Sequence, residues 1–323
     1  MTIIPLLKSM RQPLKILKLG VLGFLNHLGY SIVKLPSKPR QTSEAAVVLV
    51  GGRPIKIHIG NPLYDAYQKN PQLNCLIGIG AEMVKERFPD SWAVDVGANV
   101  GDTLAIIKGK AAMPVICVEG DPVCCELLEE NSRQFEEVFL VKTFLADTPG
   151  EANVELQKTG WNTTLTKAKT DGLGQRLQFQ TLDQVVQGLN RQVRVKLLKV
   201  DTEGYDLRIL RGAAGILERD QPVITFELNR ENVEPLGDSV GDFFDYLVKL
   251  GYHHFILNDS GGGFICALNE QDRGVLLDLY QYSYLGRPIY YFDIWVFHRS
   301  DRGLFEHFLA QERARSRQLK LVV

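Results

Sequence analysis

The chain has 323 residues, of which 45% are hydrophobic and 23% are charged, a balance typical of a soluble globular protein. The formal net charge of −1 excludes an overall positive field of the kind that draws proteins to nucleic acid, so we expect no nucleic-acid partner. The five cysteines form no CxxC pair, which excludes the pattern of a disulfide framework or a zinc site. We therefore expect reduced cysteines and a cytoplasmic protein.

Residues 1–45 are expected to form a basic amphipathic arm. Residues 1–40 contain seven lysines and arginines and no acidic residue. Charges and prolines interrupt the apolar runs of this segment, which excludes a membrane span, and it lacks the apolar core and cleavage site of a signal peptide. Two interpretations stay open: the arm makes a peripheral contact with an anionic membrane surface, or it packs on the domain or on a second subunit of a homo-oligomer.

Residues 46–90 are expected to form a hairpin and a helical lead-in. The sequence AAVVLVGGRPIKIHIG predicts two short strands around a turn at Gly51 and Gly52. Helical patterning follows from Pro62 to about Phe88, and the Pro-Asp pair after it ends the helix. This segment precedes the part of the chain in which we expect the chemistry.

Residues 91–300 are expected to form the main domain. Short apolar runs alternate there with amphipathic helices, and strands that are continuously apolar indicate a sheet covered on both faces. This rhythm predicts an α/β fold with a doubly wound, mostly parallel sheet. The expected strands are WAVDVG, PVICVEG, EVFLVKTFLAD, VRVKLLKVD, PVITFEL, YHHFILND and YYFDIWVFH. A polar stretch from Thr148 to about Asn190 interrupts them, and residues 301–323 predict a helical tail whose arginines form a solvated face.

Two glycines follow the first of these strands, in the sequence SWAVDVGANVGDT. In open α/β sheets, ligands bind beyond the carboxyl ends of the strands, which is where Asp95, Gly97, Asn99 and Gly101 lie. Glycine lacks a Cβ atom, so a ligand can approach the backbone of this loop closely. We therefore expect these four residues to contact a ligand.

Two further carboxylates end the neighbouring strands. Glu119, at the end of the second strand, can accept hydrogen bonds from both hydroxyls of a ribose. Asp147, at the end of the third, can accept one from the exocyclic amine of a purine. Three acidic strand ends, Asp95 included, disfavour a pyrophosphate, and the loop spacing differs from G-x-G-x-x-G, so a nicotinamide dinucleotide is disfavoured. A positively charged adenosine ligand such as S-adenosylmethionine fits this edge.

Six segments of the chain resemble, in order, the FkbM-type S-adenosylmethionine-dependent methyltransferases; they are VDVGANVGDT, VICVEGDP, FLAD, TLDQVV, LLKVDTEGYDLRILRGA and PVITFEL. The resemblance covers about residues 92–228 and implies a Rossmann-like class I methyltransferase sheet with a reversed strand near its C-terminal end. It also implies methyl transfer, usually to an oxygen of a sugar or another small hydroxylated molecule. By position, it implies that the four loop residues line the methionine part of S-adenosylmethionine, with the ribose at Glu119 and the adenine at Asp147.

Candidate catalytic groups lie on the fourth strand, VKLLKVDTEGYD. Lys199, Asp201 and Glu203 reach the same edge of the sheet, and a hydroxyl acceptor needs a base as it attacks a methyl group. We expect Asp201 and Glu203 to act as base or to orient the acceptor. Two alternatives stay open: Lys199 only pairs with a carboxylate, and Glu203 only caps the next helix. Asp201, with Glu227 and Asn229 from the next strand, also forms an oxygen-rich set that fits Mg²⁺.

These features predict an S-adenosylmethionine-dependent O-methyltransferase that acts on a hydroxyl of a small acceptor, a sugar or a glycoconjugate. The main domain alone carries this prediction, because the arm and the tail lie outside the resemblance. Two alternatives stay open. The same fold can methylate a nitrogen or a carboxylate, or the chain is a non-catalytic cofactor-binding protein that acts as an interaction module.

Overall fold

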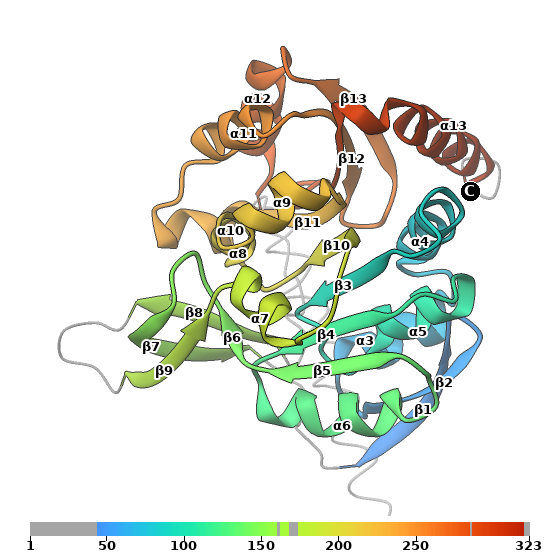
Figure 1. Cartoon of the computed structure of the whole chain (residues 1–323), viewed down its shortest axis with the longest axis vertical. Helices are drawn as coiled ribbons and strands as arrows, with labels where there is room; N and C mark the ends of the chain where they lie inside the picture. The colour runs from blue at the N-terminus through green and yellow to red at the C-terminus, as the bar shows by residue number, and fades with distance from the viewer. Residues whose placement is uncertain (1–43, 160–161, 168–173, 285, 320–323) are drawn as a thin grey trace, which may run out of the picture. The chain divides into compact units, whose positions relative to one another are not determined.

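The structure, a computed structural model, describes residues 44–159, 162–167, 174–284 and 286–319 (Figure 1). Contacts divide the chain into two units, residues 1–39 and residues 40–323, and all described residues belong to the second unit. The expected basic arm therefore lies outside the described residues except for its last two positions. Within the described part of the chain, no helix is both long and apolar enough to cross a membrane.

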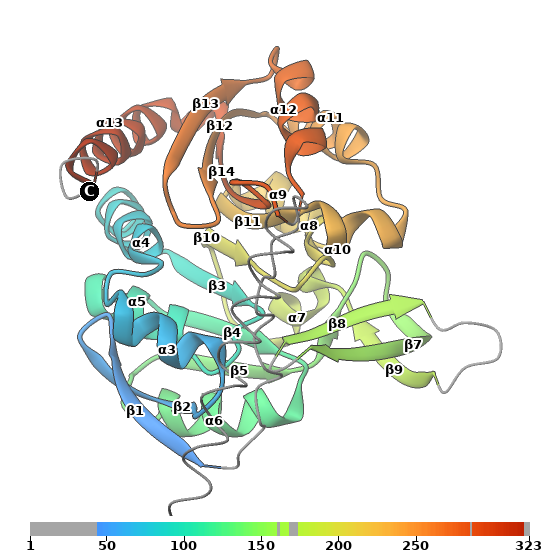
Figure 2. The same cartoon turned by 180° about the vertical axis from the view of Figure 1, so that it is seen from behind.

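An eight-stranded sheet forms the centre of this unit, in the order β13-β12-β14-β11-β10-β3-β4-β5 (Figures 1 and 2). The five strands from β11 to β5 are parallel, whereas β14 runs antiparallel to both of its neighbours. The predicted mostly parallel sheet and its reversed strand are confirmed. The strands are β3 (Trp92–Val96), β4 (Val115–Glu119), β5 (Val138–Lys142), β10 (Val195–Val200), β11 (Val223–Asn229), β12 (Tyr252–Asp259), β13 (Phe264–Asn269) and β14 (Tyr291–His298).

Helices cover both faces of the sheet (Figures 1 and 2). Side chains of a strand alternate between faces, so Leu198 of β10 belongs to one hydrophobic core and Leu197 to the other. The first core includes α7 (Leu182–Gly188), α8 (Asp206–Arg211), α9 (Ala214–Asp220), α11 (Val240–Lys249) and α12 (Arg273–Tyr282). The second includes α4 (Cys75–Arg87), α5 (Asp102–Lys110), α6 (Pro122–Ser132) and α13 (Arg302–Leu319). The double cover explains why the central strands are apolar throughout.

The remaining short elements connect this frame. They are α3 (Pro62–Lys69), α10 (Arg230–Val233) and the 3₁₀ turns η1 (Glu234–Leu236) and η2 (Arg299–Asp301). The predicted hairpin is confirmed as β1 (Ala45–Val50) and β2 (Arg53–His58), with positive φ at both turn glycines. The predicted cap of α6 is also confirmed, because Asp121 Oδ1 accepts a hydrogen bond from the Val123 amide at 2.8 Å.

The third predicted strand, EVFLVKTFLAD, is wrong as a single element. β5 ends at Lys142, and Phe144–Leu145 instead form β6, which joins a separate four-stranded sheet in the order β6-β9-β7-β8. Its other strands are β7 (Gly150–Thr159), β8 (Asn162–Lys167) and β9 (Gln175–Gln180), all within the polar stretch that interrupts the α/β rhythm. The Thr143 amide still donates to the Glu119 carbonyl of β4, and the chain then turns so that the Phe144 ring packs on Gly120.

The C-terminal helix α13 packs on the sheet through an aromatic cluster. The Phe308 side chain is 2% exposed, and its ring centroid lies 4.6 Å from that of Trp295 and 5.4 Å from that of Phe297. The predicted helical tail is confirmed, and this face of it belongs to the core.

We expect Phe308→Ala to lower the free energy of unfolding by about 3 to 5 kcal/mol, because it leaves a cavity between α13 and β14. Denaturant unfolding measures this change. Arg317→Ala, at an exposed position of the same helix, is the control and should change stability by less than about 0.5 kcal/mol. Equal effects of the two substitutions would show that α13 does not contribute to the core.

Candidate functional site

A cavity of about 910 Å³ lies at the carboxyl ends of β3, β4, β10 and β11. Its wall also includes residues of the lead-in before β3, of the turn between β12 and β13, and of α13. The strand ends at which we expected a ligand therefore open into one cavity. Gly97, Asn99, Glu119, Asp201 and Glu203 are among the residues that line it.

The glycine loop after β3 packs against the loop after β10. Gly97 has a φ of +75°, and a Cβ atom there would lie 1.9 Å from the carbonyl oxygen of Asp201. The Asp201 amide in turn donates to the Val96 carbonyl at 3.0 Å. Gly97 is thus required by a neighbouring loop, a reason different from the ligand contact that we expected. Gly101, with a φ of +86°, is the N-cap residue of α5 and does not line the cavity.

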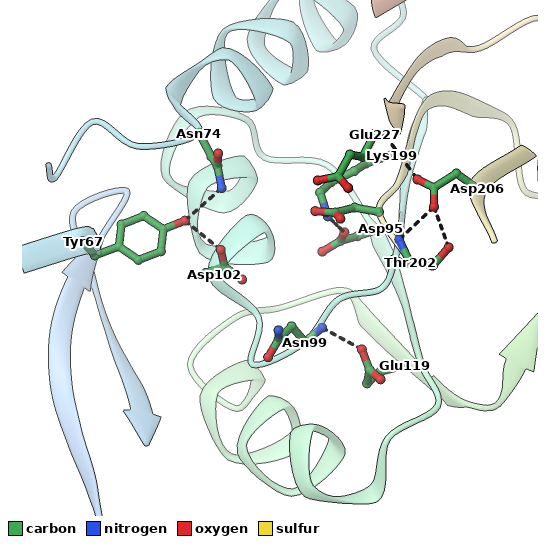
Figure 3. Close-up of polar contacts among 11 residues, drawn as sticks. Tyr67, Asn74, Asp95, Asn99, Asp102, Glu119, Lys199, Thr202, Asp206 and Glu227 are labelled. Atoms are coloured by element: carbon green, nitrogen blue, oxygen red, sulfur yellow. Dashed lines mark hydrogen bonds and ion pairs between the residues drawn. The ribbon is translucent and has the colours of Figure 1, made fainter. Parts of the chain in front are cut away.

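Glu119 is held in a fixed orientation by backbone amides. Its Oε2 accepts from the Asn99 amide at 2.9 Å, and its Oε1 accepts from the Asp121 amide at 2.7 Å (Figure 3). Burial raises the pKa of the Glu119 carboxyl group above its usual value, although these two hydrogen bonds oppose the shift. Each carboxylate oxygen can accept more than one hydrogen bond, so Glu119 keeps capacity for a ligand in the cavity.

Lys199 connects the two loops electrostatically. Its Nζ lies 3.3 Å from Asp95 Oδ1 and 3.3 Å from Asp201 Oδ2. The predicted pairing of Lys199 with carboxylates is confirmed. Burial opposes the charge on Lys199, but the neighbouring carboxylates outweigh it and raise the pKa of the amine, which therefore stays protonated. Burial also raises the pKa of Asp95, which is 0% exposed, to about 6.

Two acceptor atoms of the glycine loop are buried without a hydrogen-bond partner among the described residues. They are Asp95 Oδ2 and Asn99 Oδ1. Asn99 also has a positive φ of 48°, so the loop backbone holds it in a conformation that few residues adopt. Unpartnered buried acceptors are costly unless a donor reaches them. Asn99 lines the cavity and Asp95 does not, so Asn99 Oδ1 marks a place for a ligand that donates hydrogen bonds.

Glu203 lies in the turn beyond β10. It lines the cavity, and its Oε2 accepts from the Asn232 side-chain amide at 3.1 Å. The alternative that Glu203 caps the next helix is wrong, because α8 begins after Tyr205 without a side-chain capping bond. Burial, with the charge of Asp201, raises the pKa of Glu203 to about 7. Asp201 itself has a side chain that is 45% exposed and paired with Lys199.

Three further carboxyl groups extend this acidic edge. Glu227 and Asp293 face each other as direct partners on the antiparallel strands β11 and β14, and both line the cavity. Asp206 is 0% exposed and accepts from the Thr202 amide, the Thr202 hydroxyl and the Glu227 amide (Figure 3). Burial raises the pKa of Asp206 and of Asp293 to about 7, and raises that of Glu227 well above its usual value. Burial therefore disfavours the ionised form of these carboxyl groups, and a positively charged ligand would favour it.

The expected magnesium set does not assemble. Asn229 accepts a hydrogen bond from the Glu231 amide and caps α10, so it does not face the cavity with Asp201 and Glu227. Among the residues that the structure describes, no group of three or more His, Cys, Asp and Glu side chains could hold a metal ion. The Mg²⁺ expectation is not supported.

Asp147 lies away from the cavity. It is exposed and is not among the lining residues, because the chain leaves the large sheet at Thr143 and carries Asp147 toward the smaller one. Thr143, Phe144 and Leu145 line the cavity beside Glu119 instead. Their place depends on how the chain turns after β5, which no local sequence pattern indicates.

Other lining residues were not predicted because they come from distant parts of the chain. Arg315 of α13 reaches the cavity, donates to both carboxylate oxygens of buried Glu312, and donates to the Gly262 carbonyl. The interpretation of the tail arginines as a solvated face is wrong for Arg315. Tyr290 and Tyr291, whose rings meet edge to face at 4.6 Å, line the cavity next to Asp293.

One protein-family model matches part of the chain. Residues 95–253 match the model of the methyltransferase FkbM domain. The match includes the glycine loop, Glu119 and the acidic edge as far as Glu227, and it leaves out the lead-in, β14 and α13. No curated protein sequence matches the chain significantly.

Solved structures show more distant likenesses. The chain is similar to methyltransferase FkbM from Methylobacillus flagellatus KT, with a TM-score of 0.37 and 17% identity over 55% of this chain and 44% of that one. It is similar to precorrin-6y C5,15-methyltransferase from Geobacter metallireducens GS-15, with a TM-score of 0.34 and 12% identity over 68% and 86% of the two chains. It is also similar to the plantazolicin methyltransferase BamL in complex with a triazolic desmethylPZN analog and SAH, with a TM-score of 0.39 and 9% identity over 73% of this chain and 89% of that one. The chain thus spans less than half the length of the first of these structures.

Proposed function

We propose that this chain, whose residues 95–253 form a methyltransferase domain of the FkbM family, methylates a hydroxyl group of a small acceptor, a sugar or a glycoconjugate. From this domain we infer methyltransferase activity with S-adenosylmethionine as the methyl donor. The hydroxyl and the sugar are our proposal. One observation supports it most: a single cavity joins the oriented Glu119 carboxylate to an acidic edge that contains a candidate base.

The residues present fit S-adenosylmethionine. Glu119 offers a fixed carboxylate to the two ribose hydroxyls, and Thr143 with Phe144 forms the wall beside it, on the side that we assign to the adenine. Asn99 Oδ1, in the wall of the cavity, is a buried acceptor without a partner among the described residues, and the ammonium group of the methionine part would supply a donor. The acidic edge favours the positive charge of a sulfonium.

When bound, S-adenosylmethionine supplies an electrophilic methyl group. Glu203 is the base that we propose for the acceptor: it takes the hydroxyl proton as the acceptor oxygen bonds to the methyl carbon. Its raised pKa, about 7, keeps it basic enough to hold that proton near neutral pH. Asp201 is less suited to this role, because Lys199 neutralises it at 3.3 Å, so we assign it to orienting the acceptor. Tyr290 and Tyr291 would pack against the acceptor and keep water away.

An amine is a second candidate acceptor, and one observation favours it. Glu227 and Asp293 face each other at the acceptor end and make no ion pair with any other described residue, so a positively charged group would relieve their repulsion. The same two carboxyl groups oppose a carboxylate acceptor. An experiment that identifies the methylated atom therefore decides between the two proposals.

Incubation with S-adenosylmethionine labelled in its methyl group tests this choice. Neutral glycosides, amino sugars, small carboxylic acids and a cell extract would serve as acceptors, and mass spectrometry would locate the label. We expect label on a sugar hydroxyl. Label on a nitrogen would replace the first proposal by the second, and label on a carboxylate would contradict both.

We expect Glu119→Ala to raise the dissociation constant for S-adenosylmethionine about tenfold or more, because it removes charge-assisted hydrogen bonds to the ribose. Calorimetric titration measures this constant. Asp147→Ala is the matched control: as an exposed residue outside the cavity, it should leave the constant within about twofold. An unchanged affinity in Glu119→Ala, or an equal loss in Asp147→Ala, would show that the ribose and adenine assignments are wrong.

We expect Glu203→Gln to lower kcat about 100-fold or more while the affinity for S-adenosylmethionine stays within about twofold. A base works only when deprotonated, so the wild-type rate should rise as the pH increases through about 7, and the variant should lose this rise. Glu231→Gln, at an exposed position of α10 away from the cavity, is the control. A variant that keeps both the wild-type rate and its pH profile would exclude Glu203 as the base.

A further inference from the structure

The lead-in before β3 lies outside the matched domain but forms one wall of the same cavity. Asn70, Leu73 and Asn74 line it together with Asp102, the first residue of α5. In Figure 3, Tyr67 and Asn74 point toward Asp102 on one side of the glycine loop, and Lys199 lies on the other side. The chain thus brings a second segment, distant in sequence, to the loop that we assign to the methionine part of the cofactor.

A buried hydrogen-bond chain connects this wall to α5. Tyr67 is 2% exposed, and its hydroxyl donates to Asp102 Oδ2 at 2.7 Å. The Asn74 side-chain amide donates to the same hydroxyl oxygen at 3.4 Å, so the phenolic proton is directed toward Asp102. Asn74 precedes α4 in a left-handed conformation, with a φ of 58°, and its side chain makes no capping bond to that helix. The side chain of Asn74 thus contacts Tyr67 through its amide nitrogen and does not cap α4 through its oxygen.

Asp102 belongs to the charged environment of the glycine loop. It is 5% exposed, and burial raises its pKa while the hydrogen bond from Tyr67 opposes that shift. Its charge in turn contributes to raising the pKa of Asp95 and that of Lys199, so the three groups act on one another. A buried carboxylate keeps one orientation only when its oxygens are hydrogen-bonded, and Tyr67 supplies such a bond.

The methionine part of the cofactor must lie over this loop if the proposed function is correct. The ribose is assigned to Glu119 at the end of β4, and the methyl group must face Glu203 beyond β10. The amino-acid part then lies between them, over the loop after β3, where Asn99 Oδ1 lacks a donor among the described residues. Asp102 borders this place from the lead-in side.

We infer that Tyr67, supported by Asn74, is a positioning residue that holds Asp102 at the methionine end of the cofactor, so that the lead-in is part of the cofactor site. The inference rests on the proposed function. The competing explanation is that the Tyr67–Asp102 bond only fastens α3 to α5. The two explanations differ in which part of the ligand loses affinity when the hydroxyl is removed.

Calorimetric binding of two ligands to the full chain tests the inference. S-adenosylhomocysteine carries the amino-acid part, whereas 5′-methylthioadenosine shares the adenosine and lacks it. We expect Tyr67→Phe to raise the dissociation constant of S-adenosylhomocysteine about five- to tenfold, as expected for one buried hydrogen bond to a charged group. The constant of 5′-methylthioadenosine should change by less than about twofold.

Matched variants separate positioning from a general loss of structure. Tyr64→Phe removes a hydroxyl from the same helix, one that makes no hydrogen bond within the described residues, and should affect neither ligand. Asn74→Gly keeps the left-handed backbone and removes the amide, so we expect a smaller loss, about two- to threefold, again for S-adenosylhomocysteine alone. Thermal unfolding of each variant reports its folding, and Asn74→Gly carries the test if Tyr67→Phe does not fold.

The outcomes distinguish the inference from the proposed function. Loss of both ligands to the same extent in Tyr67→Phe, or of neither, would overturn the inference and leave the proposed function standing. Wild-type protein that binds neither S-adenosylmethionine nor S-adenosylhomocysteine would overturn the proposed function and the inference together. Selective loss of S-adenosylhomocysteine supports both.

Discussion

Acidic side chains outnumber basic ones in the lining of the cavity. Lys199 compensates Asp95 and Asp201, but within the part of the chain that the structure describes, Glu227 and Asp293 line the same cavity without an ion pair. Burial, together with the charges of neighbouring carboxylates, raises the pKa of both groups, and burying such carboxylates without a positive partner weakens a fold. A ligand that brings its own positive charge removes the repulsion, which is why the acidic edge suits a sulfonium and disfavours phosphate.

The sequence predicts the features that depend on neighbours along the chain. Apolar runs predict the central strands, and the ends of consecutive parallel strands meet at one edge, so Asn99, Glu119 and Glu203 are correctly brought to one cavity. Asp95 lies beneath its wall, fully buried and paired with Lys199. The departure of the chain after Lys142 depends instead on how Phe144 packs over Gly120, a contact between residues 24 positions apart. Asp147 is misplaced for that reason.

Residues that line the cavity or support its wall from far away in the sequence have no local signature. Tyr67 lies in an ordinary amphipathic helix, and Arg315 lies among other basic residues of a C-terminal helix. What distinguishes each of them is a partner, Asp102 for Tyr67 and buried Glu312 for Arg315, and only the folded chain supplies it. Both lie outside the matched family domain, so this chain builds part of its cavity from segments that the family model does not include.

The contact between Gly97 and Asp201 has a consequence for how this protein can change over evolutionary time. Because the Gly97 backbone contacts the Asp201 backbone directly, the side of the cavity that we assign to the methyl donor meets the side that we assign to the acceptor without a side chain of residue 97 between them. New acceptors can be accommodated by altering Tyr290, Tyr291 or α13, which border the cavity outside this contact. Position 97 cannot be altered in this way, because any larger residue would clash with the Asp201 carbonyl oxygen and push the end of β3 away from β10.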